Sequence, residues 1–261
     1  MNDLAVVVLA AGEGKRFNNG RPSTKPKVLF KIAGNPIISY PLKTIKKLEP
    51  TQIIIIVGHK ADVVKKALGS GYEYVFQDKA LGTADATKCA IPILKPQIKN
   101  FLVLNGDDSA FYSLSTLKAV ILKHKKEKNV LTFVTLLKKN PFGLGRIVRL
   151  KGGRLLKIVE EKNANDEEKK IHEVNDGCYL FEKNWFIKNI SKVNQLKVGE
   201  YYLTDMAEIA LFQDEHVGTF KLVNESEWAS VNSFKELKYA DQLMRKGVER
   251  QKTKKFLDAK V

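Results

Sequence analysis

The chain has 261 residues, is 44% hydrophobic and carries a formal net charge of +16 at pH 7, which is enough apolar material for one large or two small domains. No stretch reaches the roughly 18 apolar residues of a membrane span, no signal peptide is evident, and Cys89 and Cys178 lack a metal-binding spacing, so we expect a cytoplasmic protein without membrane contacts. The lysines form charge runs, which are usually solvated faces, and no aromatic residues are interleaved with them, so we expect no specific nucleic-acid binding, and the role of the excess positive charge is left open.

Strand and helix patterns alternate through the first half of the chain. Short apolar runs predict buried strands, and apolar residues at helical spacing predict the helices between them. Strands are expected at Val6–Leu9, Ile53–Val57, Tyr72–Gln77, Phe101–Asn105 and Val130–Leu137. Helices are expected from Asn35 to Leu48, at Ala61–Leu68, at Gly82–Ile91, and from Ser113 or Ser115 to about Lys126. The pair Asn35-Pro36 is typical of a helix start, although Pro41 requires a later start or a kink.

The second half of the chain is richer in strand patterns. Strands are expected at Arg146–Leu150, Leu155–Glu160, Glu173–Phe181 and Gly218–Val223, the first two joined by a hairpin. The stretch Glu200–Phe212 is expected to lead into a helix, and a further helix is expected from Ser233 to about Lys255. The alternation in the first half predicts an α/β fold with a doubly wound, mostly parallel, Rossmann-like sheet and a smaller β-rich lobe. We expect one main domain over residues 1–235, followed by an amphipathic helix and tail over residues 236–261.

The stretch from Val6 to Leu29 carries the clearest signal of a phosphate site. Its strand ends in small residues that let a backbone approach a ligand closely, and exposed N–H groups there can bind phosphate oxygens. These small residues are Ala10, Ala11, Gly12 and Gly14, and the basic residues that follow are Lys15, Arg16, Arg21, Lys25 and Lys27. The third glycine of the dinucleotide fingerprint and the Ser/Thr of a Walker loop are both missing. For the glycines alone, an ordinary strand-to-loop turn is the simpler explanation.

Further candidate residues follow the ends of neighbouring strands. Ligands of parallel α/β sheets bind at the carboxyl ends of the strands, where this sequence places Ala10–Arg16, Gln77 and Asn105–Asp107. Asp107 suits Mg²⁺, which prefers hard oxygen ligands, and the adjacent Asp108 is a second candidate. From its position alone, a loop-capping role explains Asp107 equally well.

A series of short motifs then occurs in one order along the chain. L-A-A-G-x-G-x-R and P-K-V-L come first, followed by Q-x-x-x-L-G-T-A at 77–84, N-G-D at 105–107, G-L-G-R-I-V-R at 143–149, I-V-E-E-K at 158–162, V-N-D-G at 174–177, G-E-Y-Y-L-T-D at 199–205 and V-N at 231–232. In this order they resemble the sugar-nucleotide pyrophosphorylases, and among them the bacterial N-acetylglucosamine-1-phosphate uridylyltransferases. The resemblance implies a Mg²⁺-dependent transfer of UMP from UTP to N-acetylglucosamine 1-phosphate, giving UDP-N-acetylglucosamine and pyrophosphate, with the β-rich lobe binding the sugar.

The same resemblance implies roles for individual residues. Arg16 and Lys27 would neutralise the triphosphate and the transition state. The residues that would bind the nucleotide are Leu9, Ala10, Ala11, Gly12, Gln77, Gly82, Thr83 and Asn105. Those that would bind the sugar phosphate are Gly145, Glu160, Asn175, Tyr202 and Thr204. Asp107 and Asn232 would hold Mg²⁺.

The chain also departs from this family's pattern. Lys15 stands in place of the usual Thr, Asp85 in place of a common His, and Asp108–Phe111 in place of a short apolar turn. These changes leave the preferred sugar and base open, so glucose-1-phosphate uridylyl or thymidylyl transfer is an alternative. A non-catalytic sugar-nucleotide-binding regulator and a basic RNA-binding protein are further alternatives, and a homo-oligomer is left open. Hexapeptide repeats are absent from the sequence, so we expect no acetyltransferase activity.

Overall fold

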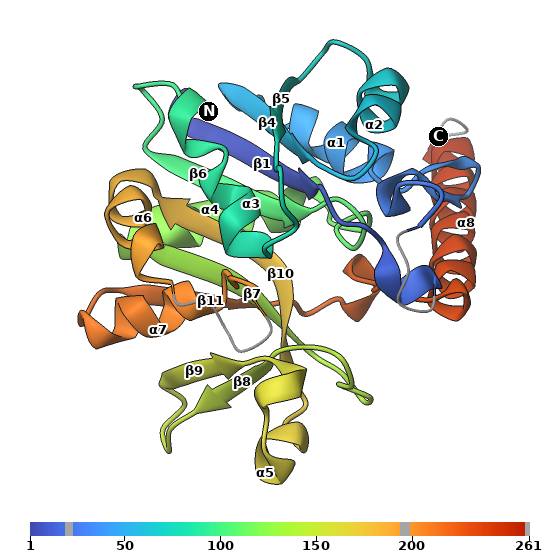
Figure 1. Ribbon diagram of the computed structural model, residues 1–261. Helices are drawn as coiled ribbons and strands as arrows, with labels where there is room; N and C mark the ends of the chain where they lie inside the picture. The colour runs from blue at the N-terminus through green and yellow to red at the C-terminus, as the bar shows by residue number, and fades with distance from the viewer. Residues whose placement is uncertain (19–22, 194–198, 259–261) are drawn as a thin grey trace.

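The computed structural model describes residues 1–18, 23–193 and 199–258, and for Arg16, Asn18 and residues 248–258 it describes the backbone alone. A central sheet of nine strands carries helices on both faces (Figure 1). The main path through the sheet has the order β11-β7-β10-β6-β1-β4-β5. The bounds of these strands are β1 Leu4–Ala10, β4 Gln52–Val57, β5 Glu73–Phe76, β6 Asn100–Asn105, β7 Leu131–Leu137, β10 Glu173–Glu182 and β11 Val217–Lys221.

Most neighbours in this path are parallel. Strand β1 pairs in parallel with β4 and β6, β4 pairs in parallel with β5, and β7 with β11. Strand β10 runs antiparallel to β6 and β7. Strand β1 is buried on both sides, with Val6 and Val8 in the core on one face and Ala5 and Val7 in the core on the other. The predicted α/β fold with a doubly wound, mostly parallel sheet is therefore confirmed.

Two layers of helices cover the sheet. The helices α1, α2 and α4 pack on the face of Val6 and Val8, and the helices α3, α6 and α7 pack on the opposite face. Their bounds are α1 Ser39–Lys46, α2 Ala61–Leu68, α3 Thr83–Lys88, α4 Leu114–Glu127, α6 Lys183–Asn189 and α7 Asp205–Phe212. Short 3-10 helices lie at Lys15–Asn18, Lys27–Leu29, Ile91–Ile93, Glu161–Asn163, Ile190–Lys192 and Glu225–Glu227. In the described part of the chain, no helix is both long and apolar enough to cross a membrane.

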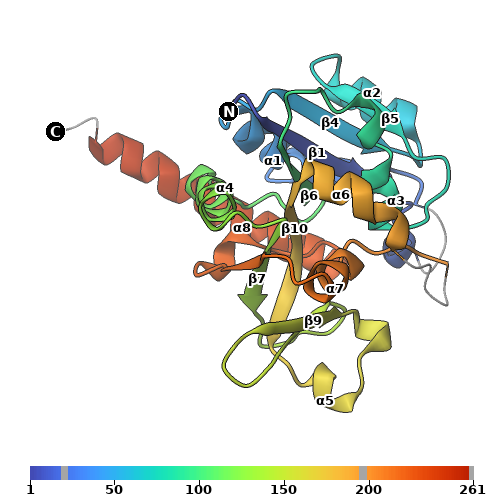
Figure 2. The same cartoon turned by 90° about the vertical axis from the view of Figure 1, so that its left-hand side faces the viewer.

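The predicted smaller lobe extends from one end of strand β10. It consists of the antiparallel strands β8 (Arg146–Arg149) and β9 (Leu155–Val159) and the helix α5 (Asp166–Lys169). The lobe lies below the central sheet in the views of Figure 1 and Figure 2. It joins the sheet where Val174 of β10 pairs with Arg146 of β8. The turn between β8 and β9 contains Gly152 and Gly153 with positive φ, as expected for the hairpin.

The predicted helix start at Asn35 is wrong. Ala33 and Gly34 both have positive φ (44° and 86°) and turn the chain back, so that Asn35 pairs with Ile32. Residues Lys31–Ile32 (β2) and Asn35–Pro36 (β3) therefore form a small hairpin, and helix α1 begins at Ser39. Pro41 lies in the first turn of that helix, where its missing N–H has no intrahelical partner to lose. The later start that Pro41 suggested is the correct one.

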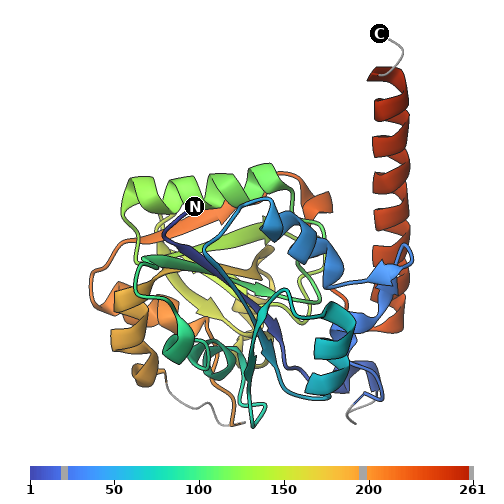
Figure 3. The same cartoon turned by 90° about the horizontal axis from the view of Figure 1, so that it is seen from above.

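The last helix, α8 (Phe234–Asp258), packs by its first turns against this hairpin. A third core cluster fills the contact, and it contains Phe17, Ile32, Ile37, Ala110, Ala229, Val231 and Ala240. Figure 3 shows the far end of α8 extending well beyond the helices that cover the sheet. The helix thus begins inside the packed domain and leaves it.

Candidate active site

A pocket of about 450 Å³ opens at the carboxyl ends of strands β1, β5 and β6. Most of the residues that the sequence assigned to substrates or to a cation line it, namely Leu9, Ala10, Ala11, Gly12, Lys27, Gln77, Gly82, Thr83, Asn105, Asp107, Gly145, Glu160, Asn175, Tyr202 and Asn232. Thr204 is 2% exposed and lies behind the wall. The side chain of Arg16 lies outside the described part of the structure, although its backbone is part of the Lys15–Asn18 3-10 helix.

The turn after β1 forms the first wall. Gly12 is exposed, and a Cβ at this position would meet no atom within 4 Å, so a ligand can approach the backbone there. Gly14 has a φ of +66°, a left-handed conformation that glycine adopts without strain. The carbonyl of Glu13 accepts a hydrogen bond from the Ser23 N–H at 2.8 Å, which closes the turn. Lys15, the departure from the family's pattern, forms an ion pair with Glu13.

Lys27 reaches into the pocket from the Lys27–Leu29 3-10 helix. Its ammonium forms an ion pair with Asp107 and donates a hydrogen bond to Oδ1 of Asn232 at 2.8 Å. The side chains of Lys27 and Asp107 are only 14% and 21% exposed, so water screens the pair incompletely. The same ammonium lies 6.0 Å from the centre of the Phe17 ring. A positive charge therefore lies against both residues that the sequence assigned to Mg²⁺.

Asp108 faces the floor of the pocket. Its Oδ2 accepts a hydrogen bond from Nδ2 of Asn105 at 3.1 Å, and its Oδ1 accepts one from the Ser109 hydroxyl at 3.3 Å. Burial, and then the neighbouring charge of Asp107, hold the pKa of the Asp108 carboxyl well above its usual value. In the described ranges, no group of three or more His, Cys, Asp or Glu side chains has the arrangement of a metal site. Any cation here would thus have few protein ligands.

Asp176 is a pocket residue that the sequence interpretation missed. It is 3% exposed, accepts a hydrogen bond from the Tyr112 hydroxyl through Oδ2, and accepts the Cys178 N–H through Oδ1 at 2.9 Å. Burial raises the pKa of its carboxyl to about 7. Its carbonyl oxygen accepts the Trp228 indole N–H at 3.1 Å. Asp176 follows Asn175 in the V-N-D-G motif, but the burial of Asp176 depends on a contact with Tyr112 that no local sequence pattern reveals.

The side of the pocket predicted to hold the base is built around Gln77. Its Nε2 donates to Oδ2 of Asp85 at 2.7 Å and to the carbonyl of Gly82 at 3.3 Å. Asp85, the second departure from the family's pattern, therefore orients the Gln77 amide. The Thr83 hydroxyl accepts the Leu203 N–H at 3.1 Å and so ties this loop to the segment after residue 199. These hydrogen bonds fix the position of the Gln77 side chain in the pocket.

The side predicted to hold the sugar phosphate is built from three strands and the segment that contains Thr204. A Cβ on Gly145 would lie 3.6 Å from Oε1 of Glu160 and 3.7 Å from Cβ of Asn175, so these three residues adjoin one another. The Thr204 hydroxyl donates to Oε1 of Glu160 at 3.0 Å, and Nδ2 of Asn175 donates to the Tyr179 hydroxyl. The register between β10 and β7 shifts between Asn175 and Tyr179, an irregularity of the kind that redirects side chains, and Asn175 lines the pocket.

The two adjacent tyrosines, Tyr201 and Tyr202, have different surroundings. Tyr201 packs against the core cluster on the α3 side of the sheet, whereas Tyr202 lines the pocket. The Tyr202 hydroxyl donates to Glu200, and the ammonium of Lys162 lies 3.0 Å from Oε2 of Glu200 and 5.0 Å from the Tyr202 ring centre. Lys162 thus closes the rim between the lobe and the main domain.

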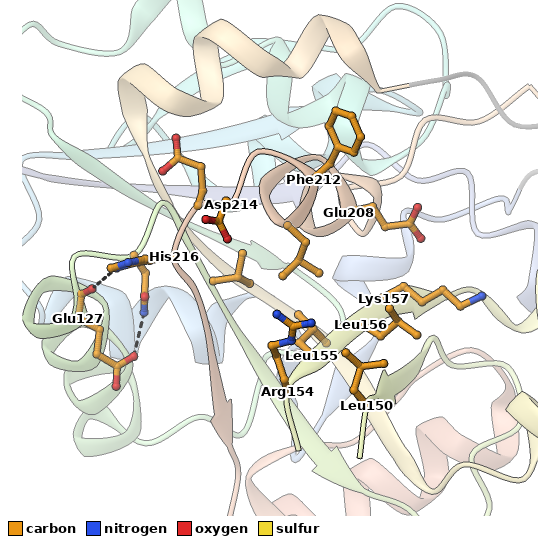
Figure 4. A pocket seen from close by; sticks show the side chains of 14 residues that line it. Glu127, Leu150, Arg154, Leu155, Leu156, Lys157, Glu208, Phe212, Asp214 and His216 are labelled. Carbon is orange, nitrogen blue, oxygen red and sulfur yellow. Dashed lines mark hydrogen bonds between the residues drawn. The ribbon is translucent and has the colours of Figure 1, made fainter. Parts of the chain in front are cut away.

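A larger cavity of about 670 Å³ lies elsewhere, between α7, β11 and the lobe. Figure 4 shows the charged groups of Arg154, Glu208 and Asp214 spread around its leucine side chains. Phe212 on its border is 94% exposed. Among the described residues that line this cavity, none was assigned to substrate or cation and none is a glycine. The smaller pocket is therefore the candidate active site.

Comparison with known proteins settles the family. The family model described as Nucleotidyl transferase matches residues 5–246. The chain belongs to this family. The chain is 38% identical over 249 residues to the bifunctional protein GlmU of Thermoanaerobacter pseudethanolicus and 37% identical over 249 residues to that of Streptococcus suis. Each match covers 95% of this chain and 53% of the relative, so the chain spans about half the length of these relatives.

The fold of this nucleotidyl transferase also matches a solved structure. A Bacillus anthracis protein assigned as a glucose-1-phosphate thymidylyltransferase superimposes with a TM-score of 0.77, covering 93% of this chain and 95% of the other. At 22% identity this similarity concerns the fold alone. The family resemblance and the fold class expected from the sequence are both confirmed.

Proposed function

We propose that this nucleotidyl transferase transfers UMP from UTP to N-acetylglucosamine 1-phosphate, giving UDP-N-acetylglucosamine and pyrophosphate. The observation that carries the proposal is the position of the Lys27 ammonium, held by Asp107 and Asn232 beside the glycine turn after β1. A phosphate oxygen of the sugar attacks the α-phosphorus of UTP while the bond to the bridging oxygen of pyrophosphate breaks. Negative charge grows on the non-bridging and leaving oxygens, where fixed cations lower the barrier.

The residues present fit a divalent cation. Asp107 and Asn232 come from distant segments and bind one ammonium, so their oxygens already converge on a single positive charge. Both supply hard oxygen atoms, and Mg²⁺ commonly takes one or two protein ligands and completes its shell with phosphates and water. When bound, such an ion would offset charge on the phosphates. Asp107 and Asn232 would hold it, and Mg²⁺ is the proposed cofactor.

The chain's own residues then have separate tasks. The backbone of Ala10, Ala11 and Gly12 binds the triphosphate through N–H groups, an assignment supported by the exposure of Gly12. Lys27, whose ammonium lies in the same pocket, neutralises the phosphates. The predicted partner of Lys27 in this task is Arg16.

The remaining pocket residues select the substrates. Gln77, whose Nε2 already donates to Asp85 and to the Gly82 carbonyl, offers its Oε1 to the base, where it can accept the N3–H of uracil. Glu160 and Asn175 present oxygen atoms beside Gly145, and these suit the hydroxyl groups of a sugar. The absence of a Cβ at Gly145 leaves room for the ring. In this proposal one pocket serves both partners, UTP and a sugar 1-phosphate.

Glucose 1-phosphate or a thymidine nucleotide is the alternative. It is favoured by Asp85 and Asp108, where the chain departs from the uridylyltransferase pattern. A non-catalytic regulator would be expected to lack the charged residues of the phosphate site, and Lys27, Asp107 and Asn232 are all present. A catalytic role is therefore preferred.

A panel of substrate pairs tests the proposal. Pyrophosphate release is measured with UTP or dTTP and with N-acetylglucosamine 1-phosphate, glucosamine 1-phosphate or glucose 1-phosphate, in the presence of Mg²⁺. We expect the highest kcat/KM for UTP with N-acetylglucosamine 1-phosphate, and a loss of about 100-fold or more in Asp107→Ala. Asp62→Ala, an exposed carboxylate on α2, is the control. Absence of pyrophosphate release from every pair would reject the proposed function.

A further inference from the structure

We propose that Glu236, in the first turn of helix α8, is a positioning residue that fixes Asn232 for the cation. The inference rests on the proposed function, because it assigns a task to a residue beside the proposed cation site. The assignment also gives a role in the active site to a residue that lies beyond the expected end of the main domain at residue 235. The start of the last helix would then belong to the active site rather than to a separate tail.

The hydrogen bonds at the start of α8 carry the first step. The carboxylate of Glu236 accepts the backbone N–H of Asn232, and the Ser233 hydroxyl accepts the Glu236 N–H at 3.2 Å. The Ser233 carbonyl accepts the Leu237 N–H at 2.9 Å as the first helical bond. The sequence S-F-K-E at 233–236 is a capping-box pattern, but here the glutamate binds one residue further back than usual. The backbone of Asn232 is thereby tied to the helix.

The helix is itself fixed to the domain. Oδ1 of Asp241 accepts the backbone N–H of Ala33 at 2.7 Å, on the hairpin between β2 and β3. Ala240 is fully buried in the third core cluster, and Val231 is 1% exposed in the same cluster. The Phe234 ring meets the Phe17 ring edge-on at 5.1 Å, and Figure 1 shows the start of α8 beside the segment that follows β1. Asn232 therefore lies between two anchored points.

The position of Asn232 matters because an oxygen ligand of Mg²⁺ must lie at about 2.1 Å from the ion. Its Oδ1 now lies 2.8 Å from Nζ of Lys27. Asn232 is a loop residue between Val231 and the first turn of α8, so without Glu236 its backbone N–H loses the partner that sets the direction of its side chain. Residues that orient metal ligands through hydrogen bonds typically change metal affinity 10-fold or more when removed.

Binding of Mn²⁺ together with UTP, followed by electron paramagnetic resonance, is a readout that does not depend on turnover. We expect Glu236→Ala to weaken Mn²⁺ binding by about 10-fold and to raise the Mg²⁺ concentration for half-maximal pyrophosphate release by a similar factor. Glu236→Gln, which keeps an oxygen acceptor for the Asn232 N–H, should restore most of the affinity. Lys235→Ala and Lys238→Ala, exposed residues of the same helix turns, should match the wild type.

A double-mutant cycle separates positioning from a structural effect. In an Asn232→Ala background the side-chain oxygen is gone, so Glu236→Ala should cause no further loss of Mn²⁺ affinity. An equal loss in both backgrounds, or wild-type Mn²⁺ affinity in Glu236→Ala, would overturn the inference. Thermal unfolding of each variant identifies the temperature at which all remain folded. A wild-type protein that binds no Mn²⁺ with UTP would instead count against the proposed function itself.

Discussion

Gly82 and Tyr201 are in direct backbone contact. A Cβ on Gly82 would lie 2.3 Å from the Tyr201 carbonyl oxygen, closer than any real side chain can approach. The contact is held by hydrogen bonds from the Ala84 N–H to the Tyr201 carbonyl at 3.0 Å and from the Tyr201 N–H to the Leu81 carbonyl at 2.7 Å. The loop that carries Gln77 and Thr83 and the segment that carries Tyr202 and Thr204 are therefore one rigid unit.

Replacing Gly82 should break this unit. Gly82→Ala adds both a strained φ of +103° and the clash with Tyr201, so we expect destabilisation by about 2–4 kcal/mol and at least a 10-fold loss of kcat/KM. Gly152→Ala is a matched control, because its φ is +93° and its Cβ would meet nothing within 4 Å. The control should lose only about 1 kcal/mol. Urea unfolding checks both values, and equal losses would contradict the importance of the Tyr201 contact.

Asp85 should act through Gln77. Without the carboxylate, Nε2 of Gln77 loses its 2.7 Å acceptor and the amide can rotate. We expect Asp85→Ala to raise the KM for UTP by about 5- to 10-fold, the worth of about one hydrogen bond, with a smaller change in kcat. Gln77→Ala should give a similar increase, and the double variant should be no worse than Gln77→Ala. Steady-state kinetics at saturating sugar phosphate measure these values, and additive losses would show that Asp85 acts independently.

Lys27 should be far more important than the neighbouring lysine. Lys27→Met removes the charge that meets Asp107 while keeping much of the side-chain volume. We expect kcat to fall by about 100-fold or more, since donors aimed at developing charge are worth that much. Lys25→Met is the control, because Lys25 is exposed and its ammonium lies over the Phe30 ring. Pyrophosphate release under substrate saturation gives the comparison, and losses of similar size in both variants would argue against the assigned role.

His124 should make stability depend on pH. Its ring nitrogens contact Oγ1 of Thr132 at 2.9 Å and Oδ1 of Asn100 at 3.1 Å, and burial lowers the pKa of the ring to about 4. Between pH 6.5 and 4 the unfolded chain binds a proton that the folded protein does not, so this histidine destabilises the fold as the pH falls. His124→Gln should therefore lose less stability than the wild type on acidification over this range.

The comparison must be made between variants, because Asp176 acts in the opposite direction. Its pKa is raised to about 7, so from pH 4 to pH 7 the folded protein binds the extra proton and stability falls as the pH rises. The difference between wild type and His124→Gln cancels this contribution. Urea unfolding at pH 7, 5.5 and 4.5 measures it, with the exposed His172→Gln as control. Parallel curves for wild type and His124→Gln would show that His124 is not the titrating group.

Local patterns predicted the central sheet because its strands are continuous apolar runs. Val6–Leu9 and Ile53–Val57 lie within β1 and β4 as the structure has them, since strands buried on both faces are mostly apolar. The pocket could be anticipated for a related reason, because its residues follow these strands directly. The predicted helix start at Asn35 was wrong because Ala33 and Gly34 turn the chain back. The sequence could not show this, because helix caps and hairpin turns favour the same residue types.

Other features depend on contacts between distant residues and are not visible in the sequence. In the sequence, Asp85 is recognisable only as a departure from the family's pattern. Its hydrogen bond to Gln77 becomes visible only in the structure, where the first turn of α3 lies beside Gln77. Arg146, within the G-L-G-R-I-V-R motif, is 1% exposed and pairs with Glu161 at 2.7 Å at the base of the lobe. A charged residue in a strand is expected to be exposed. Only the packing of the lobe against β10 shows that Arg146 is buried and stabilises the loop at Gly143 and Leu144.

The antiparallel strand β10 has a consequence for synthesis of the protein on the ribosome. Residues 173–182 separate β6 from β7 in the sheet, so β7 cannot take its final place until β10 has emerged. Asn232 then meets Lys27 only after a further fifty or so residues have been made. A nascent chain can therefore assemble its first parallel strands early, whereas the complete pocket forms only after the segment that carries Asn232 has been synthesised.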